Sequence, residues 1–200
     1  MSIARLIAAA PPPERPGEPF LGPWEPLERE LQTALPPDYK DFVRLYGHCY
    51  FMQFLSVNLP RSRNPNVRLE HQASRVCKVM REVGEVPYPL WPEKGGLLPF
   101  GGTDNGDELC WLMRGEPRDW TIAIHDHDNA GIELIACDLT DFLSGLATGT
   151  LRPESFPDLL PWDPPFFVSS LDPPFTVQAS WRMGSFGRAG RSPMARREQF

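Results

Sequence analysis

The sequence predicts an α+β fold: a single domain with a central, mainly antiparallel sheet and flanking helices. Segments with helical spacing lie on both sides of a group of short apolar segments. The later apolar segments are joined by loops of hairpin length, which connect antiparallel rather than parallel strands. With 200 residues, 41% of them hydrophobic, the chain can bury a core without disulfides or a structural metal.

Two helices are expected at the start of the domain. Apolar residues at helical spacing predict the first over residues 27–35, and Pro36 and Pro37 end it. The second is predicted over residues 38–46, with an acidic residue in its first turn, and Gly47 is a natural terminator.

The middle of the chain predicts a strand followed by a surface helix. Residues 49–59 form an apolar, aromatic-rich run bounded by Gly47 and Pro60, so we expect one strand there. Residues 67–83 alternate apolar and charged side chains at helical spacing and are followed by Gly84, which predicts a helix exposed on one face.

Four short strands in two hairpins are predicted next: residues 97–100, 108–113, 120–125 and 132–136. The loops 101–107 and 126–131 that join them are rich in acidic and turn-forming residues. Asp138 then has the position of a helix cap, and the apolar spacing after it predicts a final helix over residues 139–146.

Proline marks the boundaries of this domain. Of the 24 prolines, seven lie in residues 1–26 and seven in 153–174. We therefore predict a Pro-rich extension over residues 1–23, the domain over 24–151, a Pro-rich and aromatic strap across the domain over 152–180, and a disordered basic tail over 181–200. An exposed interaction peptide is the alternative to the strap.

The cysteines and the first ten residues favour a cytoplasmic protein. The four cysteines stand far apart among apolar neighbours and form no Cys-x-x-Cys pair, which indicates buried free thiols in a reducing compartment. Residues 1–10 are apolar but are interrupted by Arg5, too short to span a bilayer and without a basic leader. A signal peptide ending at the small residues 8–10 is the alternative.

The net charge of −6 conceals an acidic body and a basic tail. Residues 181–200 carry five Arg and one Glu, so residues 1–180 carry −10. Residues 104–141 alone hold ten acidic residues against two Arg, or −8. Such a field attracts a cationic protein and repels nucleic acid, so only the Arg-rich tail offers a contact with nucleic acid or with the acidic body.

The acidic loops and their flanks are therefore the candidate partner-binding site. We expect these side chains to form one acidic surface facing a basic protein: Asp104, Asp107, Glu108, Glu116, Asp119, Asp126 and Asp128.

One pattern suggests chemistry instead of binding. His125 and His127 would point to the same face of a strand, as two imidazole ligands of a metal do, with Asp126 and Asp128 beside them. The alternative is a solvated polar turn, which the loop composition favours. No metal or other cofactor is expected, and no catalytic residue set is recognised.

Four local motifs together resemble the Smi/Knr-like family, the SUKH superfamily. They are Trp24, Leu-Pro-Pro-Asp-Tyr-Lys at residues 35–40 followed by Phe42, Leu-Leu-Pro-Phe-Gly at 97–101 leading to Asn-Gly-Asp at 105–107 and Trp111, and Leu139 with Asp-Phe-Leu at 141–143. The chain departs from the family at residues 47–49, where Gly-His-Cys replaces an Asn-Gly-type turn.

The resemblance implies a binding module without a catalytic site. Bacterial members are thought to be immunity proteins that bind and neutralise polymorphic toxins, often nucleases, and fungal relatives resemble regulatory scaffolds. An immunity protein with a basic, nuclease-type toxin as its partner is thus the expected function. The alternatives are a regulatory scaffold unrelated to toxins and a metal-dependent hydrolase that uses His125 and His127.

Overall fold

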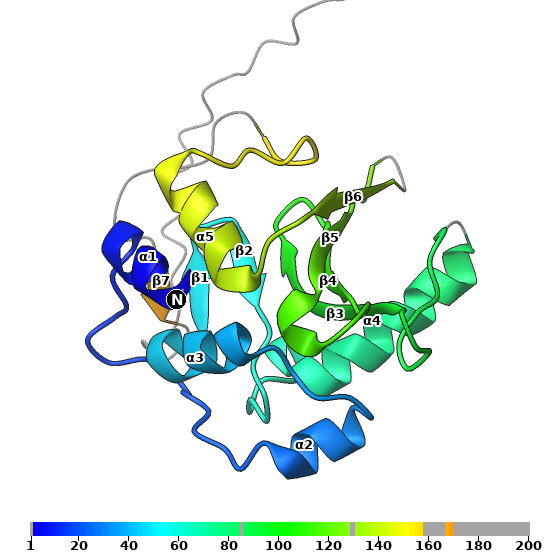
Figure 1. The fold of residues 1–200 in the computed structure, drawn as a ribbon, viewed down its shortest axis with the longest axis horizontal. Helices are drawn as coiled ribbons and strands as arrows, with labels where there is room; N and C mark the ends of the chain where they lie inside the picture. Colours follow the sequence, from blue (N-terminus) through cyan, green and yellow to red (C-terminus); the bar gives the residue numbers. More distant parts are fainter. Residues whose placement is uncertain (1, 85, 129–130, 158–166, 170–200) are drawn as a thin grey trace, which may run out of the picture.

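The computed structural model describes residues 2–84, 86–128, 131–157 and 167–169. Within these residues the chain forms a seven-stranded antiparallel sheet in the order β6-β5-β4-β3-β2-β1-β7 (Figure 1). The strands are β1 (Cys49–Phe51), β2 (Leu55–Val57), β3 (Leu97–Thr103), β4 (Glu108–Leu112), β5 (Thr121–His125), β6 (Ile132–Ile135) and β7 (Phe167–Ser169). The expected α+β fold with an antiparallel sheet is confirmed.

Helices cover both faces of this sheet. They are α1 (Ser2–Ala9), α2 (Glu25–Glu30), α3 (Pro37–Tyr46), α4 (Leu69–Val83) and α5 (Leu139–Thr148), with short 3-10 turns η1 (Pro65–Val67) and η2 (Pro117–Asp119). Helix α4 packs on one face, and α1, α3 and α5 lie together on the other (Figure 1).

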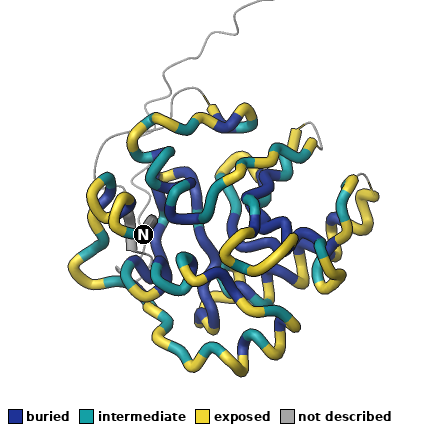
Figure 2. Tube along the Cα trace, viewed as in Figure 1, coloured by how far each residue is buried: buried dark blue, intermediate teal, exposed yellow. Residues whose placement is uncertain are grey.

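Alternation along the strands sorts side chains between these two layers. On β4, Leu109 and Trp111 point into the core shared with α3 and α5, whereas Cys110 and Leu112 point toward α4. Both sets are buried because helices cover both faces, so β4 is apolar almost throughout. Figure 2 shows the result as buried strands inside helices that are exposed on their outer sides.

Trp111 lies at the centre of the larger core. Its ring stacks on Phe100 with centroids 4.3 Å apart, and Tyr39 of α3 meets it edge-on at 5.0 Å. The Tyr39 hydroxyl donates a 2.7 Å hydrogen bond to the Asn58 carbonyl, so this buried polar group is satisfied. Helix α3 is thereby tied to the chain that follows β2.

The segment 49–59 is not one strand, as the sequence suggested, but a hairpin. Strands β1 and β2 pair with each other, and Met52 and Gln53 make the turn with φ near +50°. Neither residue is a usual former of such a turn, and no Gly, Asn or Pro lies at or beside the turn to mark it. The turn is instead held by packing, since Met52 and Phe54 are buried in the core.

The N-terminal segment contributes to the same core. Leu6 and Ala10 are fully buried where α1 packs against α5, and the Tyr46 hydroxyl donates a 2.8 Å hydrogen bond to the Ala10 carbonyl. The sequence set residues 1–23 apart as an extension because of their prolines. The apolar face of the first helix, however, packs on helices α5 and α3 and buries part of their surface.

The start of the proposed strap also packs on the domain. Phe156 is 7% exposed and meets Phe54 and Phe142 with ring centroids 5.1 and 6.2 Å apart. Most of the predicted strap and the whole basic tail lie outside the described residues.

The structure also shows the state of the cysteines and the character of the helices. All four cysteines are free, three of them buried and Cys137 half-buried. In the part of the chain that the structure describes, no helix has the length and apolar character needed to cross a bilayer.

Candidate partner-binding site

Two acidic loops meet at one end of the sheet. Strands β4 and β5 are antiparallel, with Glu108 opposite His125, so the loop before β4 and the loop after β5 lie side by side. This brings together Asp104 and Asp107 from the first loop with Asp126 and Asp128 from the second. We call these four residues the acidic end.

Asp107 fastens the two loops to each other. It is only 3% exposed, and its carboxylate accepts hydrogen bonds from the Thr103 hydroxyl (2.7 Å) and from the backbone N–H of His127 (3.1 Å). Its own N–H donates to the Thr103 hydroxyl oxygen at 3.1 Å. Asp107 therefore shapes the acidic end but offers a partner little surface.

The other carboxylates of the acidic end face outward. Asp104 and Asp128 are exposed and Asp126 is half-buried. The backbone fixes both loops: the Asp104 N–H donates to the Phe54 carbonyl at 3.0 Å, and the Asp128 N–H donates to the Asp126 carboxylate at 2.8 Å. No Lys or Arg of the described residues forms an ion pair with Asp104, Asp107 or Asp128.

A nearby phenol registers this negative field. Burial is the main cause that raises the pKa of Tyr50 above its usual value, and the neighbouring Asp104 adds to it through a side-chain hydrogen bond and then through its charge. A negative charge beside a phenol disfavours its ionised form. The Asp104 carboxylate thus has the Tyr50 side chain as a hydrogen-bond partner, which does not neutralise its charge.

Glu108 follows Asp107 directly but belongs to a different environment. It starts β4 on the face covered by α4, on the same side as Cys110. Burial raises its pKa to about 7, while Arg75 of α4 acts in the opposite direction and Asp107 reinforces the rise. Glu108 is thus a half-buried carboxylate beneath α4, not part of the exposed acidic end.

Glu116 and Asp119 lie at the opposite end of the same strands. Both are exposed in the connection between β4 and β5, which includes η2. A five-residue strand spans about 17 Å, so this pair is separated from the acidic end by roughly that distance. The structure therefore divides the expected acidic surface into two groups, with Glu108 in neither.

The two histidines do not share a strand face. Strand β5 ends at His125, and His127 belongs to the turn that follows. His125 is half-buried, which lowers its pKa, although Asp126 and Asp107 oppose the shift. His127 is exposed and its ring lies against Gly106, where an added Cβ would sit 3.3 Å from the ring. No group of three His, Cys, Asp or Glu side chains suited to a metal is found among the described residues.

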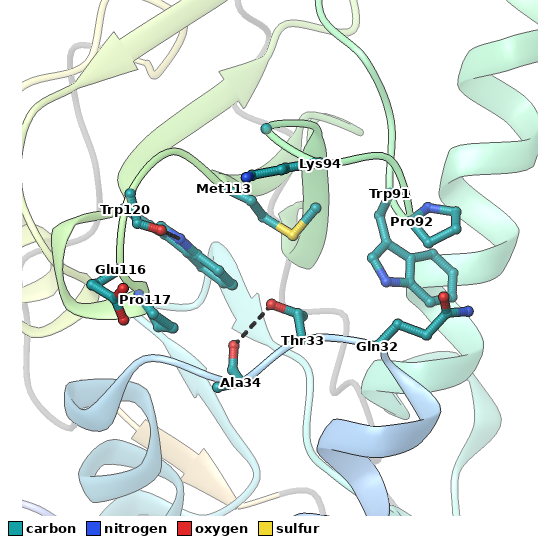
Figure 3. A pocket seen from close by; sticks show the side chains of 12 residues that line it. Gln32, Thr33, Ala34, Trp91, Pro92, Lys94, Met113, Glu116, Pro117 and Trp120 are labelled. Carbon is teal, nitrogen blue, oxygen red and sulfur yellow. Dashed lines mark hydrogen bonds between the residues drawn. The ribbon is translucent and has the colours of Figure 1, made fainter.

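A pocket near Glu116 escaped the sequence analysis. It has a volume of about 700 Å³ and lies where residues 32–34, 91–95 and 113–120 converge (Figure 3). Its walls include Trp91 and Trp120, and Glu116 lies on its rim. No sequence motif joins the three segments, because only the fold brings them together.

Fold and site together define a class of protein: a single α+β domain whose antiparallel sheet carries a preformed acidic end. A family model described as "SMI1-KNR4 cell-wall" (SUKH_6) matches residues 23–143, which is 121 residues and more than half of the chain. The chain belongs to this SUKH family, as the sequence motifs indicated. No curated protein and no solved structure matches it.

Proposed function

We propose that this chain is a non-catalytic binding protein, specifically an immunity protein that neutralises a basic toxin through its acidic end. The main support for this proposal is that two exposed carboxylates lack a cationic partner among the described residues. Asp104 and Asp128 are exposed, lie in loops whose backbone is fixed by hydrogen bonds, and form no ion pair with a Lys or Arg of the described residues. Charges in this state are available to a cationic protein.

Such a surface suits a nuclease-type toxin. The cleft of a nuclease that holds nucleic acid is positively charged, so a group of fixed carboxylates can occupy it in place of phosphates. The loops are already fastened by Asp107, so little conformational entropy is lost on docking. Inhibition then requires no chemical step, in keeping with a family that supplies no catalytic residues.

The test begins with capture of the partner. The full chain carrying an affinity tag is used to isolate bound proteins, and association with the captured protein is followed by stopped flow at several salt concentrations. The double variant Asp104→Asn/Asp128→Asn should associate about tenfold more slowly at low salt, because it loses electrostatic steering. The difference should shrink at high salt as the charges become screened.

A matched control removes two charges elsewhere. Glu14 and Glu25 are exposed, lie outside the acidic end and form no ion pair with a Lys or Arg of the described residues, so Glu14→Gln/Glu25→Gln should associate at nearly the wild-type rate. Equal association of all three proteins at every salt concentration would refute a role for the acidic end. Capture of an acidic partner unrelated to toxins would favour a regulatory scaffold of the same fold instead.

A further inference from the structure

The pocket beside Glu116 has walls suited to an aromatic ring. Figure 3 shows Trp120 and Trp91 on opposite sides, with Met113 between them. Indoles and thioethers make favourable contacts with aromatic rings, and both are enriched where proteins bind one another. The pocket therefore differs in chemistry from the acidic end.

These walls are held in place by the fold. The Trp91 indole N–H donates a 2.7 Å hydrogen bond to the Leu31 carbonyl, and the Met113 N–H donates to the Gly96 carbonyl at 3.0 Å. The Trp120 indole N–H donates to the Gly115 carbonyl at 3.4 Å, and the residue is 5% exposed. A ligand would thus meet a formed surface and would not need to order it.

Two opposite charges stand at the mouth of the pocket. Lys94 and Glu116 are both exposed, and neither forms an ion pair with the other or with any further described residue. The rim thus has no net charge, but each side of it is complementary to a charge of opposite sign. An incoming chain with a basic residue on one side of a ring and an acidic residue on the other would satisfy both.

The dimensions favour a protein loop as the occupant. A volume of about 700 Å³ exceeds what one aromatic side chain fills, and leaves room for the backbone that carries it. Thr33 and Gln32 on the near wall add a hydroxyl and an amide, which can hydrogen-bond a peptide backbone.

We propose that this pocket anchors the bound protein by accepting an aromatic side chain from one of its loops, while Glu116 and Lys94 pair with a basic and an acidic residue on either side of that ring. The inference rests on the proposed function in that the ligand is a protein. It gives the interface two parts: an acidic end that attracts the partner and an apolar anchor that retains it. Buried aromatic anchors within a polar rim carry most of the affinity in many interfaces.

The anchor can be tested without the natural partner. The probe is the peptide acetyl-Arg-Gly-Phe-Gly-Glu-amide, made also in the reverse order, and titrated into the full chain with ¹⁵N-labelled indoles. The N–H resonances of Trp91 and Trp120 should shift and saturate with at least one of the two peptides, while that of the core residue Trp111 stays in place. Replacing the peptide's Phe by Ala should weaken binding at least tenfold.

Variants of the chain locate the binding. Ala34 is exposed and lines the pocket, so Ala34→Phe should fill it and weaken peptide binding at least tenfold. Ala4→Phe adds the same ring to an exposed position of α1 outside the pocket and should change nothing. Glu116→Gln alters one exposed atom at the rim and should weaken binding about threefold. Because this change leaves the packing intact, it tests the pocket even if Ala34→Phe fails to fold.

The outcomes separate this inference from the proposed function. Equal binding by Ala34→Phe and wild type, or equal binding of the Phe and Ala peptides, would overturn the anchor. Asp104→Asn/Asp128→Asn should leave peptide binding unchanged, and a loss there would assign the peptide to the acidic end and likewise overturn the anchor. If the peptide binds as described but the chain captures no basic protein, the anchor stands and the proposed function fails.

Discussion

At the scale of single residues, neighbouring carboxylates of this chain have different roles because their surroundings differ. Asp107 is buried and holds two loops together, whereas Asp104, three residues earlier, is exposed and has no cationic partner within the described residues. Glu108 points beneath α4 toward Arg75. The sequence marks all three as acidic and cannot separate them, because loop geometry and strand direction decide which carboxylate meets water.

Glu108 should make the stability of the protein depend on pH. Its folded-state pKa of about 7 lies above its ordinary value of 4.5, because burial disfavours the charged form. The stabilising contribution of its protonated form is complete below pH 4.5 and is lost as the pH rises through 7.

Glu108→Gln removes this titration while keeping the size of the side chain. Relative to wild type, the variant should gain free energy of unfolding at pH 8, on the order of 1–3 kcal/mol, and gain much less at pH 5. Urea denaturation at the two pH values measures the difference. A gain independent of pH would show that Glu108 is charged throughout.

At the scale of elements, the start of α5 shows how a local signal and a long-range contact combine. The Asp138 carboxylate caps the helix by accepting from the Asp141 N–H at 2.7 Å, as the sequence predicted. Asp38 of α3 also accepts from the Thr140 N–H at 3.2 Å. Burial, followed by repulsion from Asp138, raises the pKa of Asp38 to about 6.

This arrangement predicts opposite results for two substitutions of Asp138. Asp138→Ala should cost about 1 kcal/mol at pH 7, because the cap is lost. Asp138→Asn keeps an accepting oxygen and removes the repulsion, so it should be at least as stable as wild type. Thermal unfolding compares the three proteins. If Asp138→Asn loses as much as Asp138→Ala, the negative charge and not the hydrogen bond stabilises the helix.

Elements with strong periodicity could be predicted from the sequence. Helices α3 and α4, strands β3 to β6 and helix α5 follow the expected segments to within a few residues, because apolar spacing and terminal glycines mark them. The hairpin of β1 and β2 could not be predicted, since its turn residues Met52 and Gln53 carry no turn signal. Tertiary packing places them there.

Only those parts of the candidate site that come from strands adjacent in the sequence could be predicted. The meeting of the loops after β3 and β5 depends on hairpin pairing, which the sequence indicates. The pocket depends on segments about 60 and 80 residues apart, and the docking of α1 on α5 brings together Arg5 and Asp141, which are 136 residues apart. Contacts at such separations leave no local pattern in a single sequence.

At the scale of the whole molecule, the sheet sets the acidic end and the pocket roughly 17 Å apart at opposite ends of β4 and β5. An interface of ordinary size covers about 800 Å² on each partner, or about 30 Å across, and can include both. At physiological salt the screening length is about 8 Å, so charges at one end have little effect at the other. The two regions should therefore contribute to binding separately.

This separation predicts that substitutions at the two ends alter different rate constants. Asp104→Asn/Asp128→Asn should reduce the association rate and leave dissociation nearly unchanged, because exposed charges act mainly on the encounter. Ala34→Phe should accelerate dissociation at least tenfold with little effect on association, because it removes contacts formed only after docking. Their effects on the binding free energy should add in the triple variant. Stopped-flow association and displacement experiments with the captured partner measure each rate. If Ala34→Phe slows association as much as the loss of the two carboxylates, both ends belong to one electrostatic surface and the pocket is not a separate anchor.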